Sequence, residues 1–117
     1  MAIDSGLVSI QEEKKGDVLI LHLKGRLDAV SSPATEKKVL DFINSGEIKV
    51  VLDFNGIEYM SSAGMRMLLA TSKKLKVFSG KLIVCSVTPT VMDILKMSGF
   101  DNILDLSNNI NDALKKF

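Results

Sequence analysis

The segment that most restricts the fold is residues 48–54, which read Ile-Lys-Val-Val-Leu-Asp-Phe. The run is rich in β-branched side chains and is apolar at nearly every position, without the strict alternation of a strand that has one face in water. This pattern is typical of a strand covered on both faces. We therefore expect residues 48–54 to lie near the centre of a sheet that is packed against helices.

Two predicted strands, residues 7–12 and 17–24, precede this run. They are separated by a short polar connection, residues 13–16, that ends in a glycine. Glycine is a residue that tight turns favour. We expect the two strands to pair as an antiparallel hairpin.

Helical spacing appears between and after the predicted strands. Ser32 followed by Pro33 is typical of an N-cap and a first helical residue, and the pattern continues until Gly46, so a helix is predicted over residues 32–45. Three more helices are indicated by apolar residues three and four positions apart: Met65, Leu68, Leu69 and Leu75 in the first, Val91, Ile94 and Leu95 in the second, and Ile110, Ala113, Leu114 and Phe117 in the third.

Two short strands, residues 82–85 and 103–106, separate the later helices. The predicted order is therefore β-β-α-β-α-β-α-β-α. Right-handed crossovers between parallel strands then give an α/β fold with a mixed, mostly parallel sheet and helices packed against it, and the first hairpin supplies the antiparallel edge. We expect one domain over residues 1–117.

Composition excludes several classes of protein. The chain has 117 residues, of which 46% are hydrophobic and 25% charged, as in a single globular domain. Fifteen basic against fourteen acidic residues leave a net charge of +1, so nucleic acid is not an expected partner. Every apolar run is broken well before the roughly 20 residues that span a bilayer. With no leader at the N-terminus, we expect a cytoplasmic protein that does not bind membranes.

The motifs of common enzymes are missing. There is no Gly-x-Ser-x-Gly elbow, phosphate-binding loop or Gly-x-Gly-x-x-Gly, and the carboxylates form no recognisable ligand cluster. We therefore predict no metal site, no cofactor and no catalytic residues. His22 is the only histidine and lies within a strand, which favours a structural or surface role. Cys85 is the only cysteine, so no intrachain disulfide can form, and its apolar strand favours an inert buried thiol.

One segment does not fit a purely structural interpretation. Ser61, Ser62, Ala63 and Gly64 lie between the central strand and the next helix, where a parallel sheet presents its functional edge. Hydroxyls beside the free N–H groups of a helix start would be open to another protein. The alternative is an ordinary serine N-cap, and the spacing alone does not decide between the two.

Three short motifs support a resemblance to a known family. Asp53-Phe54 in the central strand, followed by Met60-Ser61-Ser62-Ala63-Gly64, resembles the phosphorylation motif of bacterial anti-sigma factor antagonists, the STAS domain family. Gly25-Arg26-Leu27-Asp28 is similar to that family's Gly-x-Leu-Asp segment. Met97-Ser98-Gly99-Phe100 resembles its late helix-ending segment. The motifs occur in the family's order over nearly the whole chain, which implies a STAS-like fold.

The resemblance implies a protein switch and not an enzyme. In the family, the unphosphorylated domain binds an anti-sigma factor that is also a serine kinase, and the sigma factor is thereby released. Phosphorylation of the motif serine ends this binding, and a PP2C-type phosphatase restores it. By position, the phosphoacceptor here is Ser62, two residues before Gly64. We expect a monomer when the protein is free.

The resemblance also implies a docking surface around the phosphoacceptor. Asp28 falls where the family has an acidic residue near that serine. The family usually has Asp at the position of Ser61. The predicted partner-binding residues are Arg26, Asp28, Ser61, Ala63, Gly64, Met65 and Arg66.

Two other functions remain open. One is a STAS-like scaffold that never turns over phosphate, such as a subunit of a larger signalling or transporter-associated assembly. The other is a small serine hydrolase that uses Ser62, but the sequence offers no placed base and no oxyanion partner for it.

Overall fold

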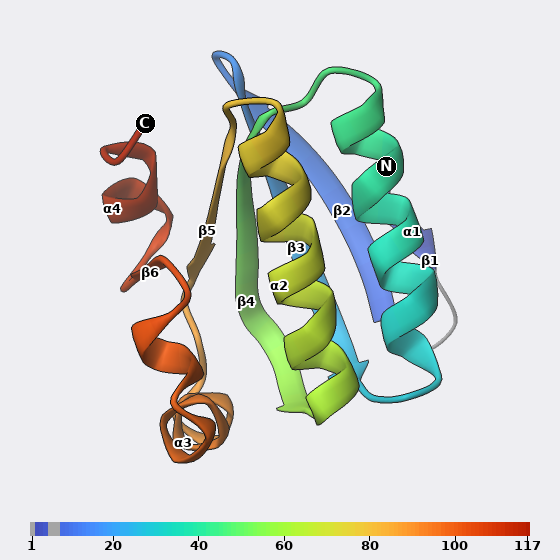
Figure 1. The fold of residues 1–117 in the computed structure, drawn as a ribbon, viewed down its shortest axis with the longest axis vertical. Helices are drawn as coiled ribbons and strands as arrows, with labels where there is room; N and C mark the ends of the chain where they lie inside the picture. Colours follow the sequence, from blue (N-terminus) through green and yellow to red (C-terminus); the bar gives the residue numbers. More distant parts are fainter. Residues whose placement is uncertain (1, 5–7) are drawn as a thin grey trace.

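The computed structural model describes residues 2–4 and 8–117, and in these residues a single six-stranded sheet runs in the order β1-β2-β3-β4-β5-β6 (Figure 1). The strands are β1 (Ala2–Asp4), β2 (Val8–Lys15), β3 (Val18–Leu27), β4 (Lys49–Met60), β5 (Lys81–Cys85) and β6 (Leu106–Ser107). The helices are α1 (Ser31–Asn44), α2 (Ser62–Val77), α3 (Pro89–Ser98) and α4 (Ile110–Leu114), with a 3₁₀ turn η1 at Phe100–Asn102.

The predicted fold class is confirmed. Strands β1, β2 and β3 pair antiparallel, and β3, β4, β5 and β6 pair parallel. The hairpin of β2 and β3 continues to the pair Lys15 and Val18, so its connection is shorter than the predicted residues 13–16. Gly16 in that connection has a φ of 62°, which suits glycine. Residue 7, where the first strand was predicted to begin, lies outside the described residues.

Two strands differ from the prediction. β1 was not predicted, and it adds an antiparallel edge beyond the hairpin. The last strand, predicted at residues 103–106, is wrong in position: only Leu106 and Ser107 pair with β5. Residues 103–105 instead form a turn that follows η1, and η1 follows Gly99, which ends α3 with a φ of 77°.

β4 is longer than predicted. It continues to Met60, whereas the sequence suggested a loop after Phe54. The pairing of β3 with β4 carries register shifts between His22 and Lys24 and between Gly25 and Arg26, so β4 follows β3 through these irregularities. The buried residues Phe54, Ile57 and Met60 are therefore three positions apart. A regular strand has buried residues at every second position, so this spacing did not indicate a strand.

Helices cover both faces of the sheet in part. α1 and α2 lie side by side in front of the strands in Figure 1. Val50, Leu52 and Phe54 of β4 belong to the larger core cluster, which also includes residues of α1, α2 and α3. Val51 points the other way, into a smaller cluster with Ala113 of α4. The prediction that this strand is covered on both faces is confirmed.

The smaller cluster also holds Cys85, whose side chain is 0% exposed. Burial raises the pKa of its thiol, so the thiolate form is disfavoured. This confirms the prediction of a buried thiol. No helix within residues 2–4 and 8–117 has the length and apolar character needed to cross a bilayer.

α2 lies unusually close to the ends of two strands. Gly64 in its first turn is buried, and a Cβ atom there would come within 2.7 Å of Met60 Cγ, 3.0 Å of Leu27 Cβ and 3.1 Å of the Leu27 carbonyl oxygen. Only a residue without a side chain fits this space. Gly64 therefore sets how closely α2 packs on the sheet.

His22 links three strands across the sheet. Its Nδ1 lies 2.6 Å from Asp53 Oδ2 in β4, and its Nε2 lies 2.8 Å from Glu13 Oε1 in β2. Both nitrogens face carboxylate oxygens, which accept hydrogen bonds, so both must carry a proton. Burial opposes this charge, but the hydrogen bonds and charges of Glu13 and Asp53 raise the pKa of His22. The sequence favoured a structural or surface role for His22, and in the structure it joins three strands in a partly exposed position.

The raised pKa of His22 predicts a dependence of stability on pH. The stabilising contribution of the charged ring is complete below the ordinary histidine pKa of 6.5 and is lost as the pH rises through the higher pKa of the folded state. Urea unfolding should therefore show a difference between wild type and His22→Gln at pH 6 that shrinks by pH 9. For such partly exposed ion pairs the difference should be up to about 1 kcal/mol. Equal stability of the two proteins at pH 6 would contradict it.

The close packing at Gly64 gives a second prediction. Gly64→Ala should lower the free energy of unfolding by about 1–2 kcal/mol, because overpacking costs about 1–3 kcal/mol and the helix preference of Ala returns less than about 1 kcal/mol. Thermal and urea unfolding measure this change. Ser62→Ala in the same turn is the matched control, since Ser62 is exposed, and it should stay within about 0.5 kcal/mol of wild type. A Gly64→Ala protein as stable as this control would show that the space is not restricted.

Candidate functional site

The ends of β3 and β4 meet at one edge of the sheet, where α1 and α2 begin (Figure 1). Leu27 at the end of β3 pairs with Met60 at the end of β4, and the Ser61 N–H donates to the Leu27 carbonyl oxygen at 2.8 Å. The segments that follow the two strands therefore lie next to each other. Asp28 follows the end of β3 and Ser62 follows the end of β4, so both belong to these neighbouring segments.

The two neighbouring serines have different surroundings. Ser61 is the N-cap of α2, and its Oγ accepts a hydrogen bond of 3.2 Å from the Ala63 N–H. Ser62 is the first residue of the helix, is exposed, and its hydroxyl makes no hydrogen bond within the described part of the chain. The N-cap interpretation thus holds for Ser61, while Ser62 leaves a hydroxyl open to solvent.

Asp28 caps the first turn of α1. Its Oδ1 accepts hydrogen bonds from the N–H groups of Val30 and Ser31 at 3.0 and 2.9 Å, and Ser31 Oγ accepts one from the Asp28 N–H at 3.1 Å. The backbone hydrogen bond from Ser31 is the main reason that the pKa of Asp28 lies below its usual value. Asp28 therefore accepts hydrogen bonds from backbone donors in its own turn, in addition to any role in partner binding.

Ser32 does not have the role that the sequence suggested. It was predicted to be the N-cap of this helix, but α1 begins at Ser31 and Asp28 supplies the capping oxygen. Ser32 is 2% exposed, and its Oγ has no hydrogen-bond partner among the described residues. An Asp three residues before Ser31 matches a capping arrangement, and this signal was available in the sequence.

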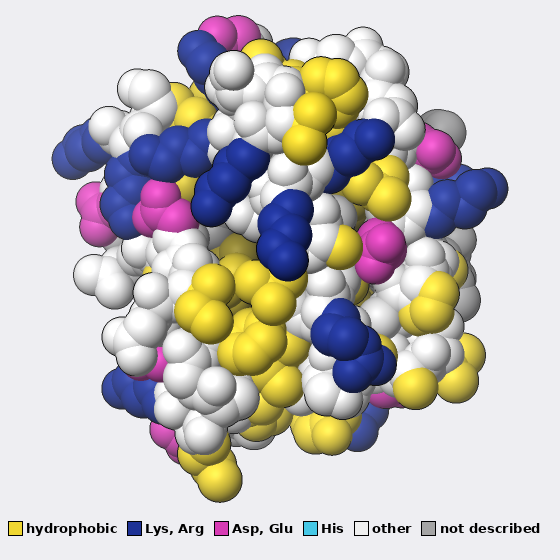
Figure 2. Space-filling view, viewed as in Figure 1, with side chains coloured by type: hydrophobic (Ala, Val, Ile, Leu, Met, Phe, Trp, Pro, Cys, Tyr) yellow, Lys and Arg dark blue, Asp and Glu magenta, His cyan; other side chains and the backbone are white. Residues whose placement is uncertain are grey.

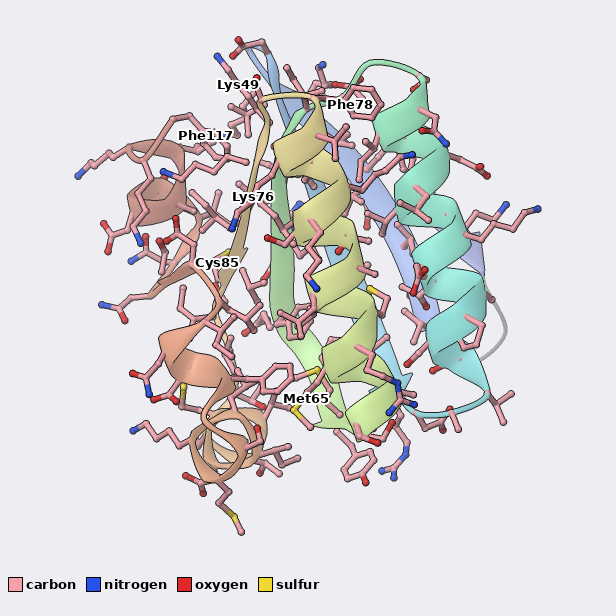
Figure 3. The ribbon with its side chains drawn as sticks, in the orientation of Figure 1. Lys49, Met65, Lys76, Phe78, Cys85 and Phe117 are labelled. Carbon is pink, nitrogen blue, oxygen red and sulfur yellow. The ribbon has the colours of Figure 1, made fainter. Side chains whose placement is uncertain are left out.

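The other predicted docking residues differ in how far they are exposed. Arg26 and Arg66 reach the surface, and the Arg26 guanidinium lies 4.6 Å from the centre of the Tyr59 ring. Met65, labelled near the start of α2 in Figure 3, is half-buried and its sulfur accepts a hydrogen bond of 3.2 Å from Ser98 Oγ in α3. Gly64 lies below the surface, so it supports the others and is not itself exposed.

The surface around these residues is shallow. A hollow of about 250 Å³ between the starts of α1 and α2 is lined by Ser32, Pro33, Glu36, Ala63 and Arg66. This volume lies below the ~300–1,000 Å³ of typical small-molecule sites. The site has the shape of a surface that another protein can cover, more than that of an enzyme pocket.

This side of the molecule also exposes basic and apolar side chains close to each other. α2 carries Arg66, Lys73, Lys74 and Lys76 and no acidic residue, and Figure 2 shows basic side chains spaced along it. Apolar side chains are exposed beside α2 in the same view, toward α3 and η1. Basic and apolar groups in one exposed area are typical of protein-binding surfaces.

Comparison with known sequences identifies relatives along nearly the whole chain. The protein BtrV of Bordetella bronchiseptica, named as an anti-sigma factor antagonist, is 31% identical over 105 residues, which are 90% of each chain. An anti-sigma F factor antagonist of Paenibacillus polymyxa is 30% identical over 108 residues, 92% of each chain.

Solved structures share the fold. An anti-sigma factor antagonist from Mycobacterium paratuberculosis has a TM-score of 0.84 and 22% identity, and the match covers 99% of this chain and 97% of that one. The anti-sigma factor antagonist SpoIIAA in its unphosphorylated form has a TM-score of 0.75 and 21% identity, over 92% and 94% of the two chains. SpoIIAA has also been solved in its phosphorylated form.

The family itself follows from the match of a whole-domain pattern. The sequence pattern of the STAS domain matches residues 9–113, which include the ends of β3 and β4, the start of α2 and the two serines. This agrees with the resemblance that the three short motifs indicated. The chain belongs to the STAS domain family.

Proposed function

We propose that this protein is an anti-sigma factor antagonist that is switched by phosphorylation of Ser62. In its unphosphorylated form it binds an anti-sigma factor that is also a serine kinase, so that a sigma factor is released. The names of its relatives support this role. The observation that carries the choice of serine is that Ser62 has an exposed hydroxyl without a hydrogen bond to any described residue, while Ser61 is engaged in capping α2.

The position of Ser62 suits a phosphate group. The kinase would transfer the γ-phosphoryl group of ATP to Ser62 Oγ, which loses its proton as ADP leaves. The product carries roughly −1.5 to −2 charges at the N-terminal end of a helix, where the helix dipole favours an anion. The fold should therefore survive the modification.

Binding should not survive it. The proposed docking surface includes Arg26, Asp28, Ser61, Ala63, Met65 and Arg66 around Ser62. A partner packed against small side chains here would have to accept a bulky, hydrated dianion close to the carboxylate of Asp28. Removal of the phosphate by a PP2C-type phosphatase would restore the surface.

Phosphopeptide mapping tests the choice of Ser62. After reaction with ATP and a candidate anti-sigma kinase from the same genome, the phosphate is expected on Ser62. Ser62→Ala should incorporate none. Ser61→Ala, the matched control, should still be phosphorylated, although the loss of the cap should cost about 1 kcal/mol of stability. Modification chiefly of Ser61 would overturn the assignment.

The same proteins separate the switch from a scaffold. Ser62→Ala should bind the anti-sigma factor with or without ATP, while the wild type should lose binding once it is phosphorylated. A wild type that is phosphorylated and still binds equally well would favour the scaffold.

Substitution of Asp28 separates its two roles. Asp28→Asn keeps an oxygen for the N–H groups of Val30 and Ser31, so its Tm should stay close to that of wild type, whereas Asp28→Ala should lower it. Asp28→Asn also removes the charge, so the affinity for the partner or the rate of phosphorylation should change. Asp28→Asn with unchanged affinity and rate would leave Asp28 with only its capping role.

A further inference from the structure

The hollow between α1 and α2 contains a buried hydroxyl that the fold leaves unexplained, and an exposed arginine beside it. Ser32 lines the hollow, and the Ser32 hydroxyl is buried and has no hydrogen-bond partner among the described residues. Arg66 lines it as well and forms no ion pair or hydrogen bond with any other described residue. Buried polar groups without partners are rare in folded proteins and call for a specific explanation.

Helix geometry brings Arg66 close to Ser62. Residues four apart on a helix lie on the same side, one turn from each other, so Ser62 and Arg66 are neighbours on α2. Ala63, three residues before Arg66, also lines the hollow. Ser62 is next to Ala63 and one turn before Arg66, and both of these residues line the hollow, so a group attached to Ser62 Oγ starts at the margin of the hollow.

We infer that the hollow is the binding site of the phosphate group on Ser62. This inference rests on the proposed phosphorylation of this serine. The Arg66 guanidinium pairs with the phosphate oxygens, for which its planar set of donors is well suited. The Ser32 hydroxyl donates a further hydrogen bond after rotation about χ1. The positive end of α2 adds to the attraction.

Glu36 also lines the hollow and its carboxylate opposes a phosphate. No ion pair joins Glu36 to Arg66 in the described residues, so Arg66 is free to turn toward the stronger charge. A phosphate of nearly two negative charges competes well against one carboxylate.

The inference changes how phosphorylation would end binding. The phosphate adds negative charge and at the same time occupies Arg66, one of the residues of the proposed docking surface. A partner would lose a cation that it could pair with as well as meet a new anion. A single phosphate group would thus add a negative charge to this surface and also neutralise a positive one.

Phosphoserine introduced at position 62 during translation tests the inference without a kinase. The second pKa of the phosphate, normally about 6, is measured by ³¹P NMR titration. In Arg66→Gln it should rise by about half a unit or more, since a paired cation lowers the pKa of an acid. Ser32→Ala should raise it as well, by a smaller amount.

Lys73→Gln is the matched control, because it removes one positive charge from α2 about two turns farther along the helix. Its effect on the phosphate pKa should be clearly smaller than that of Arg66→Gln. Equal effects of Arg66→Gln and Lys73→Gln on the phosphate pKa would overturn the pairing of Arg66 with the phosphate. An unchanged phosphate pKa in Ser32→Ala would overturn the binding of the phosphate in the hollow. The unphosphorylated variants are melted first, and their Tm should match wild type.

This experiment and the kinase experiment fail separately. If the kinase modifies Ser61 and the phosphate at position 62 still shows the shifts, the proposed function is wrong while the hollow does bind a phosphate. If the kinase modifies Ser62 and the shifts of the phosphate pKa are missing, the proposed function is supported and the hollow does not bind the phosphate.

Discussion

The site depends on the pairing of β3 with β4, which continues to the buried residues Leu27 and Met60 at the ends of the two strands. The last contact of this ladder is the hydrogen bond from the Ser61 N–H to the Leu27 carbonyl oxygen. Because that bond fixes the residue immediately before α2, it also fixes the direction in which the helix leaves the sheet. The start of α1, which follows Leu27 after a short turn, is held beside it for the same reason.

At the start of α2, neighbouring residues have different tasks: some hold the helix on the sheet and one is exposed. Ser61 satisfies a backbone donor, Gly64 allows the helix to approach the strands, and Ser62 between them is exposed. The residues that hold the helix therefore need not change when Ser62 does. A switch built in this way can alter its surface chemistry while the fold beneath it stays the same.

The opposite face of the sheet carries a different kind of contact. His22, Glu13 and Asp53 join β2, β3 and β4 through charged hydrogen bonds in a partly exposed position. This cluster stabilises the same strand pair that carries the site, but from the other side. Changes of pH that remove the charge of His22 therefore act on the sheet from the face that α1 and α2 do not cover.

The sequence by itself determined the order of the elements from β2 onward, the hairpin, the central strand and the start of a helix at the two serines, because these follow from local periodicity and from residues that favour turns and caps. Tertiary structure decided the rest. β4 follows the irregular β3 to Met60, which no regular period reveals. The exposure of Ser62, the burial of Gly64 and the hollow lined by Ser32 and Arg66 depend on how two helices lie on one sheet edge, and this is a contact between distant segments that local sequence does not encode.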